Sequence, residues 1–352
     1  MHEGSRTEAR SVHNAGEWPK WVGRATVASG SIACVVGVGA VSSAAVQERG
    51  AGLPRGGKVV ARIVIPENSG VLAVGEGAVW TTSDAVSMLM RLDPKKNAVV
   101  ARSKITPHNA CPELPGSCGE AAAGNNAVWI SRVSDNAVLR IDPRDNSVAA
   151  SIPVGPQPEG IAATPGAVWV VDKGTPSVSR IDPATNRVVA TIRIGPTRAC
   201  CSDHMAITAG GGAVWVSVPS LSAVVRIDPA TNAVTARVRL LGQPCAFLAA
   251  DDRTLWAAGG HCARTVMRVD PRTKRLSGRV KGLAAPIGLA LGFGSLWIAD
   301  LDLKVIDRVN RRTGRIVGRL PVGGNPVRLA VGFGSVWVRD DTGRVLRIRP
   351  QG

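Results

Sequence analysis

Tyrosine is absent from this 352-residue sequence, and phenylalanine occurs only three times. The core must therefore be built mainly from Val, Ile, Ala and Leu around the tryptophans. No window has the hydrophobic periodicity of an amphipathic helix, which excludes a helical domain. The G-x-S-x-G elbow, the H-E-x-x-H motif and a glycine-rich phosphate loop between a strand and a helix are also missing, so three common classes of enzyme site are excluded.

Seven tryptophans recur at spacings of 49, 40, 46, 41, 41 and 40 residues. The phrase around each is the same, and it is clearest between Gly166 and Pro196. An internal repeat of about 40 residues is typical of solenoids, propellers and arrays. The repeated tryptophans, which we expect to be structural, are Trp80, Trp129, Trp169, Trp215, Trp256, Trp297 and Trp337.

Four short runs in each repeat have the pattern of β-strands, and in the clearest repeat they span residues 159–164, 168–171, 178–182 and 188–194. The tryptophan lies in the second run, which is rich in β-branched residues. The third and fourth runs alternate apolar and polar residues, as half-buried strands do. Between them, Asp182 and the proline after it suit a type I turn. Four strands in each of seven repeats predict an all-β fold, a seven-bladed β-propeller.

The two ends of the repeat region complement each other. The last repeat contains Trp337 and the strand at 345–348, but the chain then ends without a fourth strand. Residues 59–65 have the same pattern as the fourth run at 188–194. We therefore expect this N-terminal strand to complete the last blade and close the ring, which would leave no open sheet edge between the terminal blades.

The chain divides into four segments on composition. We expect a basic N-terminal region at 1–24, an export segment at 25–46, a linker at 47–57 and the propeller at 58–350. Residues 25–46 carry no charge and end in small residues, which is typical of a cleaved signal peptide. The segment is also long enough for an uncleaved membrane anchor with N-terminal membrane contact. Both interpretations place the propeller outside the cytoplasm, either secreted or anchored to the outer face of the cytoplasmic membrane.

The formal net charge is +17, and 34 of the 43 basic residues are arginine. Such a charge would attract nucleic acid or an anionic envelope polymer. Much of the arginine is repeated, however, because every blade carries one at the same place in its third strand. We expect these side chains, with the aspartates that follow two residues later in five blades, to tie strands or blades together. The repeated arginines are Arg91, Arg140, Arg180, Arg226, Arg268, Arg308 and Arg347.

Function in a repeat protein is expected where one repeat departs from the others. Two insertions, at 106–123 and 196–206, precede the first strands of blades 2 and 4, and blade 5 has an unusual loop at 259–262. In a propeller these connections share one face around the channel. The candidate ligand-binding residues on this face are His108, Glu120, Cys200, Cys201, His204 and His261. Candidate catalytic residues are His204, His261 and Asp203, because an aspartate beside a histidine can orient it as a base.

Six cysteines remain after the export segment, an even number that indicates disulfides in an oxidising compartment. They are Cys111, Cys118, Cys200, Cys201, Cys245 and Cys262. Two favoured pairs are Cys111 with Cys118 and Cys245 with Cys262, whereas Cys200 and Cys201 could pair with each other or with a neighbour. The alternative is a zinc or copper site built from thiolates and the histidines. The spacing has no C-x2-C or H-x3-H pattern, which favours disulfides.

The phrase G-[AS]-[VL]-W-[VI] followed by R-[IV]-D-P-x-T-N, around Trp169 and Trp215, resembles the YncE-like and virginiamycin B lyase-like seven-bladed propellers. The resemblance covers about residues 58 to 350. It implies the propeller fold and, for the lyases of this group, a metal-assisted reaction that uses histidine and glutamate on the ring face. His204 and His261 are the residues that could take the place of the family histidines. The Glu-x-His pair and the W-F-T-E phrase of those lyases do not occur here.

These observations predict an exported, monomeric and non-catalytic propeller that binds a small molecule or an envelope protein through the loop face of blades 2, 4 and 5. No cofactor is expected. The first alternative is a metal-assisted lyase of the virginiamycin B lyase type, which would need a divalent metal. The second alternative is a binder of nucleic acid or of an anionic polymer, and it rests on the charge alone.

Overall fold

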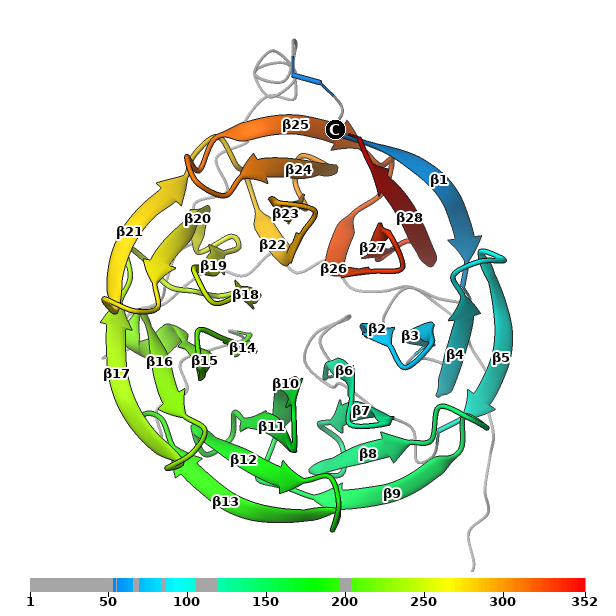
Figure 1. Cartoon of the computed structure of the whole chain (residues 1–352), viewed down its shortest axis with the longest axis vertical. Helices are drawn as coiled ribbons and strands as arrows, with labels where there is room; N and C mark the ends of the chain where they lie inside the picture. The colour runs from blue at the N-terminus through cyan, green and yellow to red at the C-terminus, as the bar shows by residue number, and fades with distance from the viewer. Residues whose placement is uncertain are drawn as a thin grey trace, which may run out of the picture. The chain divides into compact units, whose positions relative to one another are not determined.

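Seven four-stranded antiparallel sheets form a ring in the computed structural model of this chain (Figure 1), as the repeat predicts. The structure describes residues 53–54, 56–65, 70–83, 87–105, 119–196 and 204–351, all within one compact unit, 43–352. The basic region at 1–24, the export segment at 25–46 and most of the linker lie outside the described residues. Each inner strand packs against the inner strands of the two neighbouring blades, and β2 and β26 close the circle.

The strands fall into four concentric sets. The innermost strands are β2 (Leu72–Gly75), β6 (Ala121–Gly124), β10 (Pro158–Thr164), β14 (Ile207–Gly210), β18 (Leu248–Ala250), β22 (Pro286–Gly292) and β26 (Pro326–Gly332). The second strands, which carry the repeated tryptophans, are β3 (Ala78–Ser83), β7 (Ala127–Arg132), β11 (Ala167–Asp172), β15 (Ala213–Val218), β19 (Leu255–Gly259), β23 (Ser295–Asp300) and β27 (Ser335–Asp340).

The third strands are β4 (Met88–Asp93), β8 (Ala137–Ile141), β12 (Ser177–Asp182), β16 (Ala223–Asp228), β20 (Ala263–Asp270), β24 (Val305–Asn310) and β28 (Arg344–Pro350). The outer strands are β5 (Ala98–Lys104), β9 (Val148–Pro153), β13 (Arg187–Arg193), β17 (Ala233–Arg239), β21 (Arg275–Val280), β25 (Ile316–Pro321) and, in the last blade, β1 (Gly57–Val64). The described residues contain one short 3-10 helix, η1 (Pro219–Leu221), and no helix long and apolar enough to cross a membrane.

The ring closes as predicted, because β1 pairs with β28 in an antiparallel register that runs from Gly57 opposite Pro350 to Val64 opposite Arg344. The last blade therefore joins the N-terminal strand to the three final strands of the chain, and β1 lies at its outer edge (Figure 1). A strand separated from its partner by almost the whole chain makes the fold dependent on long-range pairing.

The tryptophans are fully buried, and each forms part of the packing between sheets. In five blades the indole Nε1 donates to the carbonyl oxygen of a glycine five residues earlier, at the end of the inner strand. In blades 3 and 5 a threonine hydroxyl, of Thr164 or Thr254, accepts instead. The buried donor is thus satisfied in every blade, so a single apolar core can include seven indoles.

The repeated arginines tie neighbouring blades together, which agrees with the first half of the prediction about them. Arg140 donates from Nη1 to the carbonyl of Pro183 at 3.0 Å and to Oδ1 of Asn186 at 2.8 Å, both in the next blade. Arg180 makes the same two contacts with the turn of blade 4, and six of the seven guanidiniums lie over the blade's own tryptophan. Arg268, Arg308 and Arg347 also donate to a backbone carbonyl of the next blade, whereas Arg226 donates to Thr235 of its own blade.

The aspartates, by contrast, do not pair with these arginines, and that half of the prediction is wrong. Asp182 accepts from the backbone N–H of Ala184 and from the hydroxyl of Thr185, and the other four repeated aspartates cap their own turns in the same way. The backbone hydrogen bonds lower the pKa of Asp182, so the cap stays ionised at neutral pH.

Candidate functional site

The inner strands give the ring two different ends. Because strands alternate in direction, the loops that join second to third strands and the connections between blades lie on one face, which we call the loop face. The turns that join first to second and third to fourth strands lie on the other face, which we call the turn face. The inner strands begin at the loop face, so the residues at their starts surround the loop-face end of the channel.

One position at that end differs in almost every blade. Nine residues before each tryptophan, the sequence has Val71, Glu120, Gly160, Ala206, Phe247, Gly288 and Arg328. The next position, by contrast, is aliphatic in all seven blades: Leu72, Ala121, Ile161, Ile207, Leu248, Leu289 and Leu329. The aliphatic residues form a continuous apolar ring, and the charged and aromatic residues above it come from single blades. Each inner strand thus places one side chain at the mouth, and in blades 2, 5 and 7 that side chain is charged or aromatic.

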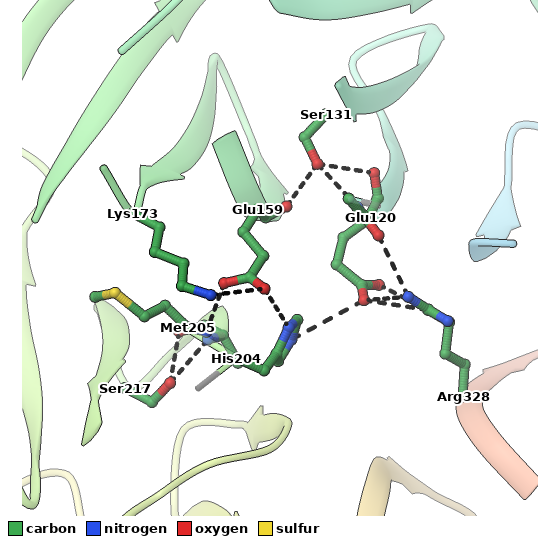
Figure 2. A network of polar contacts seen from close by, with 10 residues as sticks. Glu120, Ser131, Glu159, Lys173, His204, Met205, Ser217 and Arg328 are labelled. Carbon is green, nitrogen blue, oxygen red and sulfur yellow. Dashed lines mark hydrogen bonds and ion pairs between the residues drawn. The ribbon is translucent and has the colours of Figure 1, made fainter. Parts of the chain in front are cut away.

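Glu159 and His204 form the first ion pair of the mouth (Figure 2). His204 Nδ1 lies 3.2 Å from Glu159 Oε1, and Lys173 Nζ lies 3.9 Å from the same oxygen. The other carboxylate oxygen of Glu159 accepts the backbone N–H of Met205 at 2.8 Å. Glu159 belongs to blade 3 and His204 to the start of blade 4, so the pair joins two blades.

Glu120 and Arg328 form the second ion pair, and it spans the mouth from blade 2 to blade 7 (Figure 2). Arg328 Nη2 lies 2.9 Å from Glu120 Oε1, and Arg328 Nε donates to the same oxygen at 3.1 Å. Arg328 also donates to the carbonyl of Gly119. Both side chains are buried, and such a pair is stable only when its geometry and hydrogen bonds are this complete.

Ser131 links the backbones of the two glutamates through its hydroxyl group. Its hydroxyl accepts the backbone N–H of Glu120 at 2.8 Å and donates to the backbone carbonyl of Glu159 at 2.5 Å. Through this one hydroxyl, Ser131 connects the backbone of Glu120 in blade 2 to that of Glu159 in blade 3, as Figure 2 shows.

Glu159 and His204 each stabilise the charged form of the other. Burial alone would raise the pKa of Glu159, but the positive charge and hydrogen bond of His204, with the charge of Lys173, lower it below its usual value. Burial alone would lower the pKa of His204, but the charge and hydrogen bond of Glu159 and the charge of Glu120 raise it above 6.5. The pair therefore favours an ionised Glu159 facing the protonated form of His204.

His204 has one donor left over. Its Nε2 is buried and has no hydrogen-bond partner, and the nearest carboxylate oxygen, Glu120 Oε1, is 4.0 Å away. The ring centroid of Phe247 lies 4.6 Å from that of His204, and the Arg328 guanidinium lies 5.8 Å from the Phe247 centroid. An unsatisfied buried donor is costly, so Nε2 of His204 is the atom of this cluster at which a further acceptor oxygen would be stabilising.

A cavity of about 140 Å³ lies at this point. All seven aliphatic residues of the apolar ring line it, together with Glu120, His204, Phe247 and Arg328. The cavity is therefore apolar toward the inside of the channel and charged at its mouth. That combination, an apolar pocket with a few convergent polar groups, is the usual form of a small-molecule site.

Two of the residues predicted for ligand binding, Glu120 and His204, meet in this cavity. His261 does not line it; that side chain is 59 % exposed and lies 3.8 Å from Asp302 of the next blade. Cys245 and Cys262, one of the favoured pairs, form a disulfide in blade 5. His108, Cys111, Cys118, Cys200, Cys201 and Asp203 lie outside the described residues.

A divalent metal does not fit the described part of the mouth. No group of three or more His, Cys, Asp or Glu side chains in that part is arranged to hold a metal ion. Glu120 already faces the Arg328 guanidinium, and Glu159 faces His204 and the Lys173 ammonium. These cations would repel a metal ion, so the histidine and glutamate that the lyase resemblance implies are not arranged as metal ligands.

Arg328, Phe247 and Lys173 are site residues that the sequence analysis missed. Arg328 and Phe247 occupy the same repeat position as Glu120, nine residues before the tryptophan. Comparing the blades at that single position would have found both, because no other blade has a large aromatic or a basic residue there. Lys173 lies in a second-to-third-strand loop, where its neighbours in sequence give no signal.

The fold and the cavity define the class: a closed seven-bladed β-propeller with a polar-mouthed channel. No protein-family model matches the chain, and no curated protein matches it in sequence. Among solved structures it is similar to selenomethionine-substituted virginiamycin B lyase from Staphylococcus aureus, with a TM-score of 0.68 over 84 % of this chain and 100 % of that chain. A streptogramin B lyase structure gives a TM-score of 0.67 over 84 % and 97 %.

BamB from Moraxella catarrhalis is also similar, with a TM-score of 0.55 over 79 % of this chain and 81 % of that chain. All three are 14 % identical to this chain. At that identity the likeness establishes a shared propeller fold, in agreement with the resemblance of the repeat phrase, and it establishes nothing about activity.

Proposed function

We propose that this protein is an exported, non-catalytic binding module that takes a small ligand in the loop-face mouth of its channel. The observation that carries the proposal is the Nε2 of His204, which is buried at the cavity between Glu120 and Glu159 and has no hydrogen-bond partner. Every other polar group of the cluster already has a partner within the protein. A ligand with an acceptor oxygen would give Nε2 of His204 a partner as well.

The ligand chemistry follows from the two halves of the cavity. A protonated His204 donates from both ring nitrogens, and Nδ1 is engaged by Glu159, so Nε2 requires an acceptor oxygen from the ligand. The whole cavity, at about 140 Å³, is close to the size of the engineered cavity of about 150 Å³ that binds benzene. We therefore expect a carbonyl or similar oxygen attached to a small apolar group, presented by a small molecule or by a side chain of an envelope protein.

The protonation states favour recognition over proton transfer. A general base should have a pKa near the working pH, and the lowered pKa of Glu159 moves that carboxylate further from neutral pH. The ion pair raises the pKa of His204 and so favours the charged, hydrogen-bond-donating form of the imidazole. A fixed array of charges that bind and orient a ligand is the chemistry that these shifts support.

Export is supported by the Cys245–Cys262 disulfide, because such bonds form and persist in oxidising compartments. The uncharged segment at 25–46 is consistent with the same location. The proposal therefore places the mouth outside the cytoplasm, where the ligand would be met.

The proposal is tested with benzamide, which carries a phenyl group and an acceptor oxygen. We expect wild-type protein to bind it weakly, with a Kd on the order of 1 mM for so small a ligand. Leu289→Trp, which fills the apolar ring, should abolish binding, whereas Val64→Trp on the outer strand, at a side chain 77 % exposed, should not. Equal binding by wild type and Leu289→Trp would remove the channel as the site.

A further inference from the structure

The turn face carries a second cavity, of about 590 Å³, between blades 5 and 6. Its walls are the β18–β19 turn at 251–254, Gly294 in the β22–β23 turn, and the start of the β24–β25 turn at 310–312, with Arg268 from β20. It lies on the opposite face from the channel mouth, because each of these turns joins a first to a second strand or a third to a fourth strand. None of its lining residues is apolar.

Both turns depart from the repeat. Five residues before the tryptophan, five blades have glycine, but blade 5 has Asp251, followed by Asp252 and Arg253. The third-to-fourth-strand turns of blades 1 to 5 begin with Asp-Pro, but blade 6 has Asn310 followed by Arg311 and Arg312. These two adjoining departures each add arginine and make the cavity between them basic.

Two of the four arginines are held in place by neighbours. Arg311 forms an ion pair with Asp251. Arg268 donates from Nη1 to the carbonyl of Arg312 at 3.0 Å, and its guanidinium lies 5.7 Å from the centroid of the Trp256 ring. Arg268 Nε is buried without a hydrogen-bond partner. These guanidiniums are therefore pre-oriented at the back of the cavity.

The other two arginines are free to meet a ligand. Arg253 and Arg312 are exposed, and within the described residues neither guanidinium makes a hydrogen bond or an ion pair. Each is anchored only through its backbone N–H, which donates to the side chain of Asp251 or Asn310. These two exposed side chains line the cavity together with the fixed pair.

The carboxylates of the cavity leave a surplus of positive charge. Burial would raise the pKa of Asp251, but the backbone hydrogen bonds of Arg253 and Thr254 and the charge of Arg311 lower it, so the group is ionised and neutralised by Arg311. Asp252 is exposed and lines the cavity as well. Four guanidiniums thus face two carboxylates, one of which is already engaged.

We propose that this cavity binds a phosphate group carried on a polar molecule, a function separate from ligand binding at the channel mouth. Guanidinium forks match the geometry of phosphate oxygens and can bind them in a bidentate manner. The volume lies in the range of small-molecule sites and exceeds what one phosphate would fill. The polar lining suits the body of a phosphate ester, which could be a soluble molecule or a phospholipid headgroup.

The first test is titration of the full-length protein with pyrophosphate by calorimetry at low salt. Arg312→Ala and Arg253→Ala should each weaken binding about 10-fold, the usual effect of removing a charge-assisted hydrogen bond. Arg272→Ala is the matched control: Arg272 occupies the equivalent place in the turn of blade 5, is equally exposed, and has its backbone N–H bonded to Asp270 as that of Arg312 is to Asn310. Absence of pyrophosphate binding, or equal weakening in all three variants, would overturn the proposal.

A second arm separates the two sources of phosphate. Sedimentation with phosphatidylglycerol vesicles that is displaced by pyrophosphate and lost in Arg312→Ala would assign the site to a headgroup. Pyrophosphate binding without sedimentation would assign it to a soluble phosphate ester. Sedimentation that persists unchanged in Arg312→Ala would show that the vesicles bind elsewhere and would contradict the headgroup assignment. His204→Gln, a change at the other face, should leave all of these results unchanged, so failure here is distinguishable from failure at the mouth.

Discussion

His204 and Glu159 depend on each other for their charged states, and this coupling makes the stability of the protein depend on pH. The pKa of His204 is raised, so its contribution is complete below 6.5 and is lost as the pH rises through the folded-state pKa. The pKa of Glu159 is lowered, so its contribution is complete above 4.5 and is lost as the pH falls through the folded-state pKa. Both contributions are complete between 4.5 and 6.5.

We therefore predict that His204→Gln lowers the melting temperature most in that window, and by less toward about pH 9 and about pH 3. Thermal unfolding of wild type and variant across this range measures the difference. His261→Gln is the control, because the exposed His261 meets only the half-exposed Asp302 and a surface pair is worth little. A difference for His204→Gln that stays constant with pH would contradict the assigned protonation states.

The buried pair of Glu120 and Arg328 gives a second prediction at this scale. Glu120→Ala removes the carboxylate that pairs with the Arg328 guanidinium and leaves that cation buried, with the Gly119 carbonyl and the Phe247 ring among its neighbours. We expect the free energy of unfolding to fall by about 3 kcal/mol, measured by urea denaturation. The double variant Glu120→Ala with Arg328→Met should lose less than the sum of the single losses; strict additivity would show that the two side chains are not coupled.

The sequence predicts this site in part. Glu120 and His204 stand out because each replaces a residue that the repeat would supply, and the structure brings them together. His261 departs from the repeat in the same way, yet it lies in a second-to-third-strand loop and points to Asp302. Which loop residues reach the channel depends on the tilt and length of each loop, and a single sequence does not encode that in any local pattern.

At the scale of the elements, blades are joined by contacts between a third strand and the next blade's turn. Asn186 shows what the turn contributes, since it has a left-handed backbone at φ 56° and also accepts a hydrogen bond from Arg140. Asn tolerates this conformation better than Ala does. The same residue thus serves the turn and the junction between blades 2 and 3.

We predict that Asn186→Ala lowers the free energy of unfolding by roughly 2–3 kcal/mol, through backbone strain and through the lost acceptor. In Asn186→Gly the new residue adopts the left-handed conformation without strain, and only the acceptor is removed. The free energy of unfolding should therefore fall by less than in Asn186→Ala. Chemical denaturation of both variants separates the two contributions. If Asn186→Gly is as stable as wild type, the contact with Arg140 contributes nothing to the junction.

The elements themselves were predictable because each carries a local signal. Period-2 alternation and the tryptophan located the strands, and the β10 to β13 blade matches the four predicted runs within one residue at each end. The role of the repeated aspartates was not predictable from spacing alone. Arginine and aspartate two residues apart on one strand share a face. The carboxylate nevertheless accepts its hydrogen bonds from the backbone N–H groups of the turn that follows.

At the scale of the whole molecule, closure by β1 decides whether the ring forms. Without β1, the backbone groups of β28 that pair with it would be exposed at an open sheet edge, which promotes aggregation. We predict that a chain beginning at Gly70 loses the cooperative unfolding transition and sediments as aggregate, whereas a chain beginning at Leu53 unfolds like the full-length protein. A soluble, cooperatively unfolding chain from Gly70 would show that closure is dispensable.

The ring also keeps two functions apart. The loop face holds a small cavity lined by aliphatic residues with a balanced cluster of charges at its mouth, and the turn face holds a larger cavity lined by polar residues and a glycine, with an excess of arginine. The two cavities share no lining residue, so each can be changed by mutation while the other stays intact. The structural arginines that repeat in every blade account for much of the net charge and contribute to neither cavity, except for Arg268.

The central claim is that Nε2 of His204 donates a hydrogen bond to an acceptor oxygen of a ligand at the channel mouth. The most direct measurement is the ¹⁵N resonance of His204 Nε2 during a benzamide titration of the full-length protein. We predict a saturable shift at that nitrogen in wild type and none in Leu289→Trp. A His204 Nε2 resonance that stays unchanged up to the solubility limit of benzamide, or one that shifts equally in Leu289→Trp, would contradict the claim.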